Sequence, residues 1–267
     1  MTLAHRAQFA ARRVTQTLRC FDNGWTVLRT VAGGSEEVRY VIGDVTIVGP
    51  NVPGARVPVY EVFAEDEYAI DWFTQGLRDA PVLVDVGAHI GCFSVAFASA
   101  RPAARVHCYE PTPSTGSYLR RNVDGNGLAE RVTVHHEAVS AASGTLVMAD
   151  NGTGSGHNGV LHLGEPGAAE IEVPSVGFDD VVRRAGGEVD VLKMDAEGAE
   201  YDVVLRASPD VWRHVRRVVM EYHALPGHDF DEIRDVFAAA GLELVRRDRY
   251  TEGLGLAWFS RDPLAPS

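Results

Sequence analysis

Cysteine is scarce in this sequence, with three residues among 267. Cys20, Cys92 and Cys108 follow no metal-binding spacing and supply no disulfide framework, a usage typical of a reducing cytoplasm. Long apolar runs are missing as well, since none approaches the roughly 20 residues of a membrane-spanning helix. No secretory signal pattern is found. We therefore expect a cytoplasmic protein that does not act in a membrane.

Positive charge is in deficit. The chain has 25 lysine and arginine residues against 37 aspartate and glutamate residues, a formal net charge of −12. This balance excludes a general affinity for nucleic acid. A small molecule is the expected partner, and a homo-oligomer is left open. Residues 1–20 contain four arginines and no acid, and we interpret them as an amphipathic surface helix rather than as a transit peptide.

The close glycine triplet of a dinucleotide-binding turn is also missing. Asp85 lies near the end of an apolar run, and the turn after it holds Gly87 and Gly91 without the Gly-x-Gly-x-x-Gly spacing that cradles a pyrophosphate. A carboxylate at this point would repel a phosphate, whereas it suits a ligand with an ammonium group and hydroxyls. S-adenosylmethionine carries both and has no phosphate.

Two further acids follow the next strand patterns. Glu110 ends the pattern of residues 105–110, where an acid can accept hydrogen bonds from ribose hydroxyls. Glu137 lies within the pattern of residues 131–140 and could face the adenine amine. Because the carboxyl ends of parallel strands meet in the crevice where open α/β sheets bind ligands, the three acids favour an adenosine-type cofactor without phosphate.

Strand and helix patterns alternate from residue 81 to the C-terminus. Helices of about 10–15 residues separate the strands, which indicates βαβ units and a mostly parallel sheet. Residues 242–250 and 253–261 form an antiparallel terminal hairpin in this interpretation. The predicted fold is α/β and Rossmann-like, a seven-stranded sheet in a cofactor-binding domain of residues 81–267.

Residues 1–80 are predicted to form a small β-rich element that caps the substrate. Residues 25–31 and 38–49 have strand patterns, and residues 61–77 have a helical one. A second irregular stretch, residues 149–167, is rich in glycine and cannot order itself firmly. It is either a flexible surface insertion or a mobile lid over an active site.

Four motifs of the chain resemble those of the FkbM-type S-adenosylmethionine-dependent methyltransferases: DVGAHIGCFS, YEPTP, HEAVS and LKMDAEGAE. The resemblance extends from residue 60 to about residue 247. It implies a class I methyltransferase that methylates hydroxyl groups of sugars, glycolipids or polyketide-type natural products. The cofactor-binding residues that we expect from the motifs are Asp85, Gly87, Ala88, His89, Gly91, Glu110, Glu137 and Asp195.

The reaction centre is expected at the ends of the fourth and fifth strands. Asp195 ends the fourth strand, and Glu197 and Glu200 follow on the next turn. In this fold the fourth-strand end faces the transferring methyl group, so Asp195 and Glu197 are candidates for orienting the substrate or accepting its proton. Glu200 is equally suited to the N-terminus of the following helix, where a carboxylate is favourable.

The fifth strand ends with Glu221 and His223, two residues apart on one face. Methyl transfer to an alcohol needs a base, and histidine usually supplies it near neutral pH. His223 is therefore the candidate base, with His89 as a weaker rival and a structural role as its alternative. Asp195 with Glu221 or His223 could instead hold a divalent metal such as magnesium.

The sequence thus predicts an S-adenosylmethionine-dependent O-methyltransferase that acts on a hydroxyl of a small molecule. A nicotinamide-dependent oxidoreductase is a first alternative, disfavoured by the missing glycine triplet. A methyltransferase-like module that binds cofactor or partner without catalysis is a second.

Overall fold

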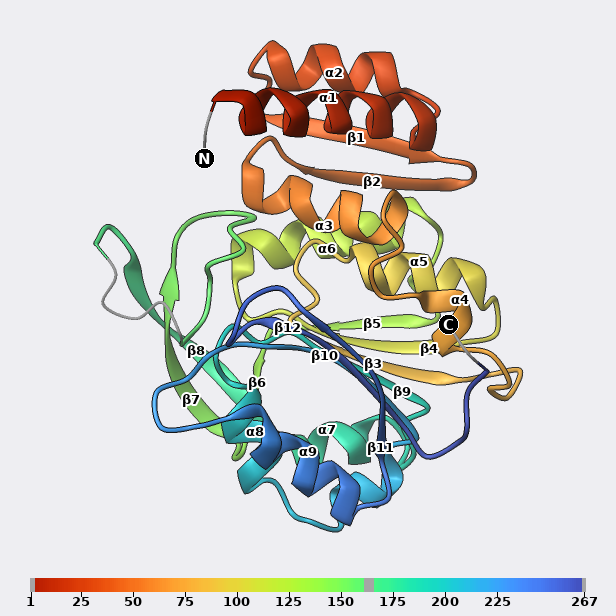
Figure 1. Cartoon of the computed structure of the whole chain (residues 1–267), viewed down its shortest axis with the longest axis vertical. Coiled ribbons are helices and arrows are strands. Elements are labelled where there is room, and N and C mark those ends of the chain that lie inside the picture. Colours follow the sequence, from red (N-terminus) through yellow and green to blue (C-terminus); the bar gives the residue numbers. More distant parts are fainter. Residues whose placement is uncertain (1–2, 161–165, 266–267) are drawn as a thin grey trace.

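The computed structural model describes residues 3–160 and 166–265. A seven-stranded sheet forms its centre, with helices on both faces (Figure 1). In spatial order the strands are β11 (Glu243–Arg249), β12 (Gly255–Ser260), β10 (Arg217–Tyr222), β9 (Val191–Met194), β3 (Val82–Val86), β4 (Arg105–Tyr109) and β5 (Val132–His135).

The sheet is parallel except at β12, which runs antiparallel to both of its neighbours. The predicted mostly parallel sheet and the terminal hairpin are therefore confirmed, and β12 lies between β10 and β11. Every residue of β3 and β9 is buried, because helices cover both faces of these central strands. The strand order reverses between β3 and β9, which is where such sheets bind ligands.

The sheet separates the core into two halves. One face packs against α5 (Cys92–Ala100) and α6 (Pro113–Gly125). The other packs against α7 (Phe178–Arg184), α8 (Glu200–Arg206), the short 3-10 helix η2 (Val211–His214) and α9 (Phe230–Ala239). Successive residues of β3 alternate between the faces, as the pleat of a strand requires: Leu83 belongs to the first half and Val84 to the second.

The N-terminal segment is more helical than predicted. It consists of α1 (Leu3–Cys20), α2 (Gly24–Ala32), the hairpin of β1 (Glu37–Ile42) and β2 (Val45–Pro50), α3 (Pro53–Phe63) and α4 (Ile70–Phe73). The helix predicted for residues 1–20 is confirmed from residue 3 onward, residues 1–2 lying outside the described part of the chain, and β2 contacts α3, α5 and α6. The segment is thus stacked on the helices of one face of the sheet (Figure 1).

Two local predictions in this segment were wrong. Residues 25–31, predicted as a strand, lie in α2, because Val27 and Val31 are four residues apart and both pack on the core. The single helix predicted for residues 61–77 is divided between α3 and α4. Asp66 and Ala69 interrupt it with left-handed backbone conformations, at φ 47° and 48°.

A second, three-stranded sheet was not predicted. It is formed by β6 (Ala138–Ser140), β8 (Ala169–Gly177) and β7 (Gly144–Asp150), in that order. The single strand predicted for residues 131–140 therefore splits between β5 and β6, which belong to different sheets. The glycine-rich stretch connects β7 to β8, and residues 161–165 of it lie outside the described residues.

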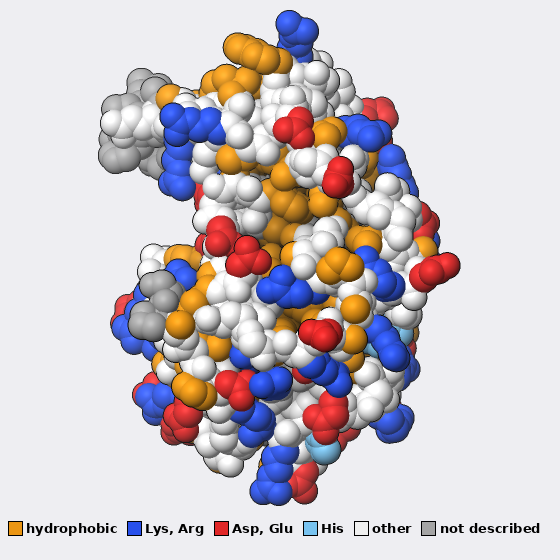
Figure 2. All heavy atoms as spheres, turned by 90° about the vertical axis from the view of Figure 1, so that its right-hand side faces the viewer, with side chains coloured by type: hydrophobic (Ala, Val, Ile, Leu, Met, Phe, Trp, Pro, Cys, Tyr) orange, Lys and Arg blue, Asp and Glu red, His pale blue; other side chains and the backbone are white. Residues whose placement is uncertain are grey.

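The described part of the chain contains no helix that is both long and apolar enough to cross a membrane. Cys92 and Cys108 are buried, and the three cysteines are free. On the face shown in Figure 2, acidic and basic side chains are interspersed rather than gathered into separate patches.

Candidate active site

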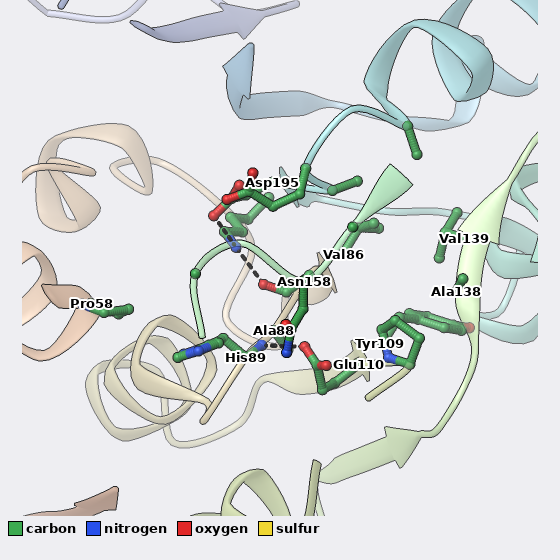
Figure 3. Close-up of a pocket in the computed structure, with 18 of the residues that line it drawn as sticks. Pro58, Val86, Ala88, His89, Tyr109, Glu110, Ala138, Val139, Asn158 and Asp195 are labelled. Carbon is green, nitrogen blue, oxygen red and sulfur yellow. Dashed lines mark hydrogen bonds and ion pairs between the residues drawn. The ribbon is translucent and has the colours of Figure 1, made fainter. Parts of the chain in front are cut away.

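A cavity lies at the carboxyl ends of β3, β4 and β9, next to the point where the strand order reverses (Figure 3). Its wall includes residues 86–89 after β3, Tyr109 and Glu110 at the end of β4, and Asp195 and Glu197 after β9. The cavity therefore brings together Gly87, Ala88, His89, Glu110, Asp195 and Glu197 from the predicted site.

Both glycines of the turn have left-handed backbones, with φ of 71° at Gly87 and 89° at Gly91. A Cβ on Gly87 would lie 1.7 Å from the carbonyl oxygen of Asp195, and one on Gly91 would lie 2.5 Å from Cδ1 of Leu119. The close neighbours of these two glycines are therefore parts of the protein itself. Gly91 is not among the described residues that line the cavity.

Asp85 also lies behind the cavity wall rather than in it. Its side chain is fully buried, accepts a hydrogen bond from Ser94 Oγ at 2.6 Å, and lies 3.5 Å from Nζ of Lys193. Burial raises the pKa of Asp85, against the opposing charge of Lys193. Lys193 does line the cavity, and it donates a hydrogen bond to the Gly87 carbonyl at 2.8 Å.

Glu110 lies where the ribose acid was expected. One carboxylate oxygen accepts a hydrogen bond from the His89 N–H at 3.0 Å, and the other accepts one from the Thr112 N–H at 2.9 Å. Burial raises the pKa of Glu110 to about 7, although these hydrogen bonds favour the charged form. The carboxylate is thus held in a fixed orientation at the cavity wall (Figure 3).

His89 has a left-handed backbone, with φ of 52°. Burial lowers the pKa of its imidazole to about 4, so the ring is neutral at neutral pH. It lies beside Ala88 at the cavity (Figure 3). A neutral ring at this position suits a lining role.

Glu137 does not reach the cavity. Its carboxylate forms an ion pair with Arg184 of α7, and it is not among the described lining residues. The wall near this point is apolar and comes from the second sheet: Ala138 and Val139 of β6, and Leu146 and Met148 of β7. The face of a flat aromatic ring such as adenine suits these side chains.

A cluster of acids surrounds His223 behind the wall that Glu197 forms; Glu197 lines the cavity, whereas Glu200, Glu221 and His223 are not among its described lining residues. Nδ1 of His223 lies 3.2 Å from Glu200, and Nε2 lies 3.6 Å from Glu197 and 3.7 Å from Glu221. Burial alone would lower the pKa of His223. The hydrogen bond and charge of Glu200, with the charges of nearby acids, outweigh burial and raise it to about 10.

Comparison with known proteins agrees with this geometry. A family model described as the methyltransferase FkbM domain matches residues 85–244. The chain belongs to this family. The match supports methyl transfer over the nicotinamide-dependent alternative, because the matched region includes the glycine turn, Glu110 and Asp195.

Three curated relatives are similar to this FkbM domain. The AMB antimetabolite synthetase AmbE of Pseudomonas aeruginosa is 28% identical over 78% of this chain, which spans only 12% of that protein. Methyltransferase sdnD of Sordaria araneosa is 29% identical over 60% of this chain and 72% of its own length. The 31-O-demethyl-FK506 methyltransferase FkbM of Streptomyces tacrolimicus is 28% identical over 57% and 68%.

Solved structures resemble the FkbM domain at lower identity. The S-adenosylmethionine-dependent methyltransferase from Agrobacterium tumefaciens is 11% identical, with a TM-score of 0.48 over 85% of this chain and 71% of that one. The crystal structure of M. jannaschii TYW2 in complex with AdoMet is 14% identical, with a TM-score of 0.43 over 85% of this chain and 87% of that one.

Glu200 combines the two roles left open for it. At the start of α8 it accepts hydrogen bonds from the backbone N–H groups of Ala196 and Gly198, at 2.8 and 3.0 Å. It also contacts His223, and its side chain is fully buried. Glu200 therefore supports the turn that carries Glu197, while it holds the imidazolium.

Two charged lining residues were missed by the sequence analysis. Glu61 of α3 reaches the cavity from the N-terminal segment, where burial and the charges of Glu67 and Asp195 raise its pKa to about 8. Lys193 stands inside an apolar strand, LKMD, and a lysine in a buried strand is itself a signal of a paired charge. Glu61 gave no comparable signal, because a helical acid is usually solvated.

Proposed function

We propose that this FkbM domain transfers the methyl group of S-adenosylmethionine to a hydroxyl group of a small molecule. The observation that carries the proposal is a cavity with a fixed carboxylate at the end of β4 and, after β9, a buried oxygen of Asp195 that has no hydrogen-bond partner among the described residues. Glu110 would accept the ribose hydroxyls. The apolar residues of β6 and β7 would enclose the adenine, and the methionine part would lie toward Asp195.

The acceptor would lie at the end of the cavity where Glu61, Asp195 and Glu197 line the wall. Within the described residues, the Glu61 side chain forms no hydrogen bond or ion pair, and Asp195 Oδ1 is buried without a hydrogen-bond partner. With a pKa of about 8 the Glu61 carboxyl group can also donate a hydrogen bond, and the Asp195 oxygen can accept one, so this end suits an acceptor rich in hydroxyls. The negative net charge of the chain supports such a ligand over nucleic acid.

Proton removal is assigned to a carboxylate rather than to His223. A histidine with a pKa of about 10 is already protonated at neutral pH and cannot take a second proton. Asp195 lines the cavity, and its carboxylate would accept the hydroxyl proton as the oxygen attacks the methyl carbon. His223 would hold Glu197 in place through its 3.6 Å ion pair.

The same cluster fits a divalent cation. Asp195, Glu197 and His223 each offer one ligand atom, and these atoms lie within 4.8 Å of one another. Two carboxylates and an imidazole suit magnesium poorly and manganese or zinc better. A bound cation would acidify an acceptor hydroxyl. Because a histidine binds a metal through its neutral imidazole, His223 would have to lose its proton when the cation binds.

Names of relatives support a hydroxyl acceptor. Two of them are named for O-methyl transfer, the demethyl-FK506 methyltransferase and the 2-O-methyltransferase NoeI of Sinorhizobium fredii, which is 30% identical over 46% of this chain and 56% of its own length. AmbE is named as a synthetase of an antimetabolite. We infer an acceptor from the same broad class, a natural product or sugar.

Two measurements test the proposal. Isothermal titration should show binding of S-adenosylmethionine and S-adenosylhomocysteine, and none of NAD. Purified protein should then transfer a labelled methyl group to members of a panel of sugars and hydroxylated natural products, with ether formation checked by mass spectrometry. Binding of NAD alone would overturn the cofactor, and binding without any transfer across the panel would favour the non-catalytic module.

A further inference from the structure

Lys193 is the sole lysine or arginine among the described residues that line the cavity. It is 4% exposed, and its ammonium has three partners on different segments. Nζ donates to the Gly87 carbonyl at 2.8 Å and lies 3.5 Å from both Asp85 Oδ1 and Asp195 Oδ2.

Asp85 contacts the Lys193 ammonium on the side that faces away from the cavity. It is fully buried on β3, where Ser94 of α5 donates to its second oxygen at 2.6 Å. Lys193 on β9 stands opposite Asp85 in the parallel register of the two strands. The ammonium therefore lies between the Asp85 carboxylate and the cavity.

The turn itself is fixed at its other side. The N–H groups of Gly87 and Ala88 both donate to the Tyr109 carbonyl at 3.0 Å. The Gly87 carbonyl, bound by Lys193, is thus the remaining polar group of that residue. Lys193 also joins this turn to Asp195, so one ammonium connects two walls of the cavity.

We propose that Lys193 is a positioning residue for the methionine end of the cofactor site, and that Asp85 acts on the cofactor through Lys193 without touching it. The inference rests on the proposed function for the identity of the cofactor. It differs from the role first expected of Asp85, a direct ligand of the methionine part. An ammonium with three N–H groups and three fixed partners can hold the Gly87 turn and Asp195 at one separation.

A double-mutant cycle tests this with S-adenosylhomocysteine and adenosine as probes. Lys193→Met, Asp85→Asn and the double variant are titrated with both. Lys193→Met should weaken S-adenosylhomocysteine binding about tenfold or more, as loss of charged hydrogen bonds implies. The double variant should bind it as Lys193→Met does, because the two residues act in series. Adenosine, which lacks the methionine part, should bind all variants as it binds the wild type.

Controls separate positioning from damage to the fold. Lys193→Met leaves the Asp85 charge buried and unpaired, so thermal unfolding is recorded for each variant. The double variant removes both charges, so it can be measured even if Lys193→Met does not fold. In that case the double variant should bind S-adenosylhomocysteine more weakly than Asp85→Asn does, and its affinity for adenosine should be unchanged. Glu137→Gln, an acid outside the cavity, should change neither affinity.

Three outcomes would overturn the proposal. Multiplying losses in the cycle would show that Asp85 acts independently of Lys193. Equal losses for adenosine and S-adenosylhomocysteine would show general damage, and unchanged S-adenosylhomocysteine affinity in the double variant would show no positioning at all. Failure of the wild type to bind S-adenosylhomocysteine is a separate result, which contradicts the proposed function instead.

Discussion

The carbonyl oxygen of Asp195 lies so close to Gly87 that a Cβ on this glycine would approach it to 1.7 Å. The contact joins the loops after two neighbouring strands, β3 and β9. Gly87 is therefore required by the packing of the protein's own backbone, before any ligand is considered. The two loops form adjoining parts of the cavity wall, so the contact holds these parts of the wall together.

Gly87→Ala should destabilise the protein by about 3–5 kcal/mol, since left-handed strain and overpacking add. Gly127→Ala is the matched control, because Gly127 has a φ of 67° with no atom within 4 Å of a built Cβ. It should cost only the strain, about 1–2 kcal/mol. Urea unfolding measures both, and equal losses would show that the Asp195 contact yields easily.

Glu110→Ala should weaken S-adenosylhomocysteine binding by about 1.5–3 kcal/mol, the scale of hydrogen bonds to a charged group. The folded pKa of about 7 adds a pH dependence. The carboxylate, a better acceptor for ribose hydroxyls than the neutral acid, forms as the pH rises through 7, so affinity should rise there. Titration calorimetry from pH 5.5 to about 8.5 checks this, and Glu110→Gln should flatten the curve. A flat wild-type curve would contradict the assignment.

Gly159 packs directly on Glu197, where a built Cβ would lie 2.3 Å from Glu197 Cβ. Glu197 has a strained left-handed backbone, with φ of 47°. Gly159→Ala should displace Glu197 and lower methyl transfer about tenfold, while S-adenosylhomocysteine affinity stays near the wild-type value. Gly144→Ala, at the start of β7 and outside the cavity wall, has open space around its built Cβ; it is the control and should keep full activity. Equal activity of the two variants would separate this segment from the acceptor site.

His223 should stabilise the fold in a pH-dependent way. Its pKa is raised from 6.5 to about 10 in the folded chain. The stabilising contribution is therefore complete below pH 6.5 and is lost as the pH rises through 10. The difference in free energy of unfolding between wild type and His223→Gln should shrink across that window. A constant difference would mean that the imidazole is neutral in the native protein.

Metal dependence separates the two mechanisms at the same cluster. If Asp195 accepts the proton directly, chelators should leave turnover unchanged, and Asp195→Asn should lower it by about 10²–10⁴-fold. If Asp195, Glu197 and His223 hold a cation, chelation should abolish turnover and manganese or zinc should restore it. Chelator-sensitive activity would thus overturn the carboxylate mechanism, and full activity of Asp195→Asn would remove this residue from both.

Local sequence patterns determined the sheet and the positions of its strand ends. Buried apolar runs identify β3 and β9 without knowledge of their neighbours, because central parallel strands are covered on both faces. Once these strands are parallel, Glu110 and Asp195 must lie at the same edge, and the cavity contains both. A continuous apolar run of strand length, followed by an acid, is enough for this inference.

Tertiary structure decided which partner each charge has. Asp85 and Glu110 both come at the end of an apolar strand pattern, yet Asp85 is enclosed by α5 and Lys193. Glu137 forms an ion pair with Arg184 instead of reaching the cavity. Glu61 enters the cavity from a helix more than a hundred residues before Asp195. Residues 25–31 became a helix through contacts with the core. Local periodicity specifies which face of an element is buried, whereas the partner of a buried charge depends on segments that only the folded chain brings together.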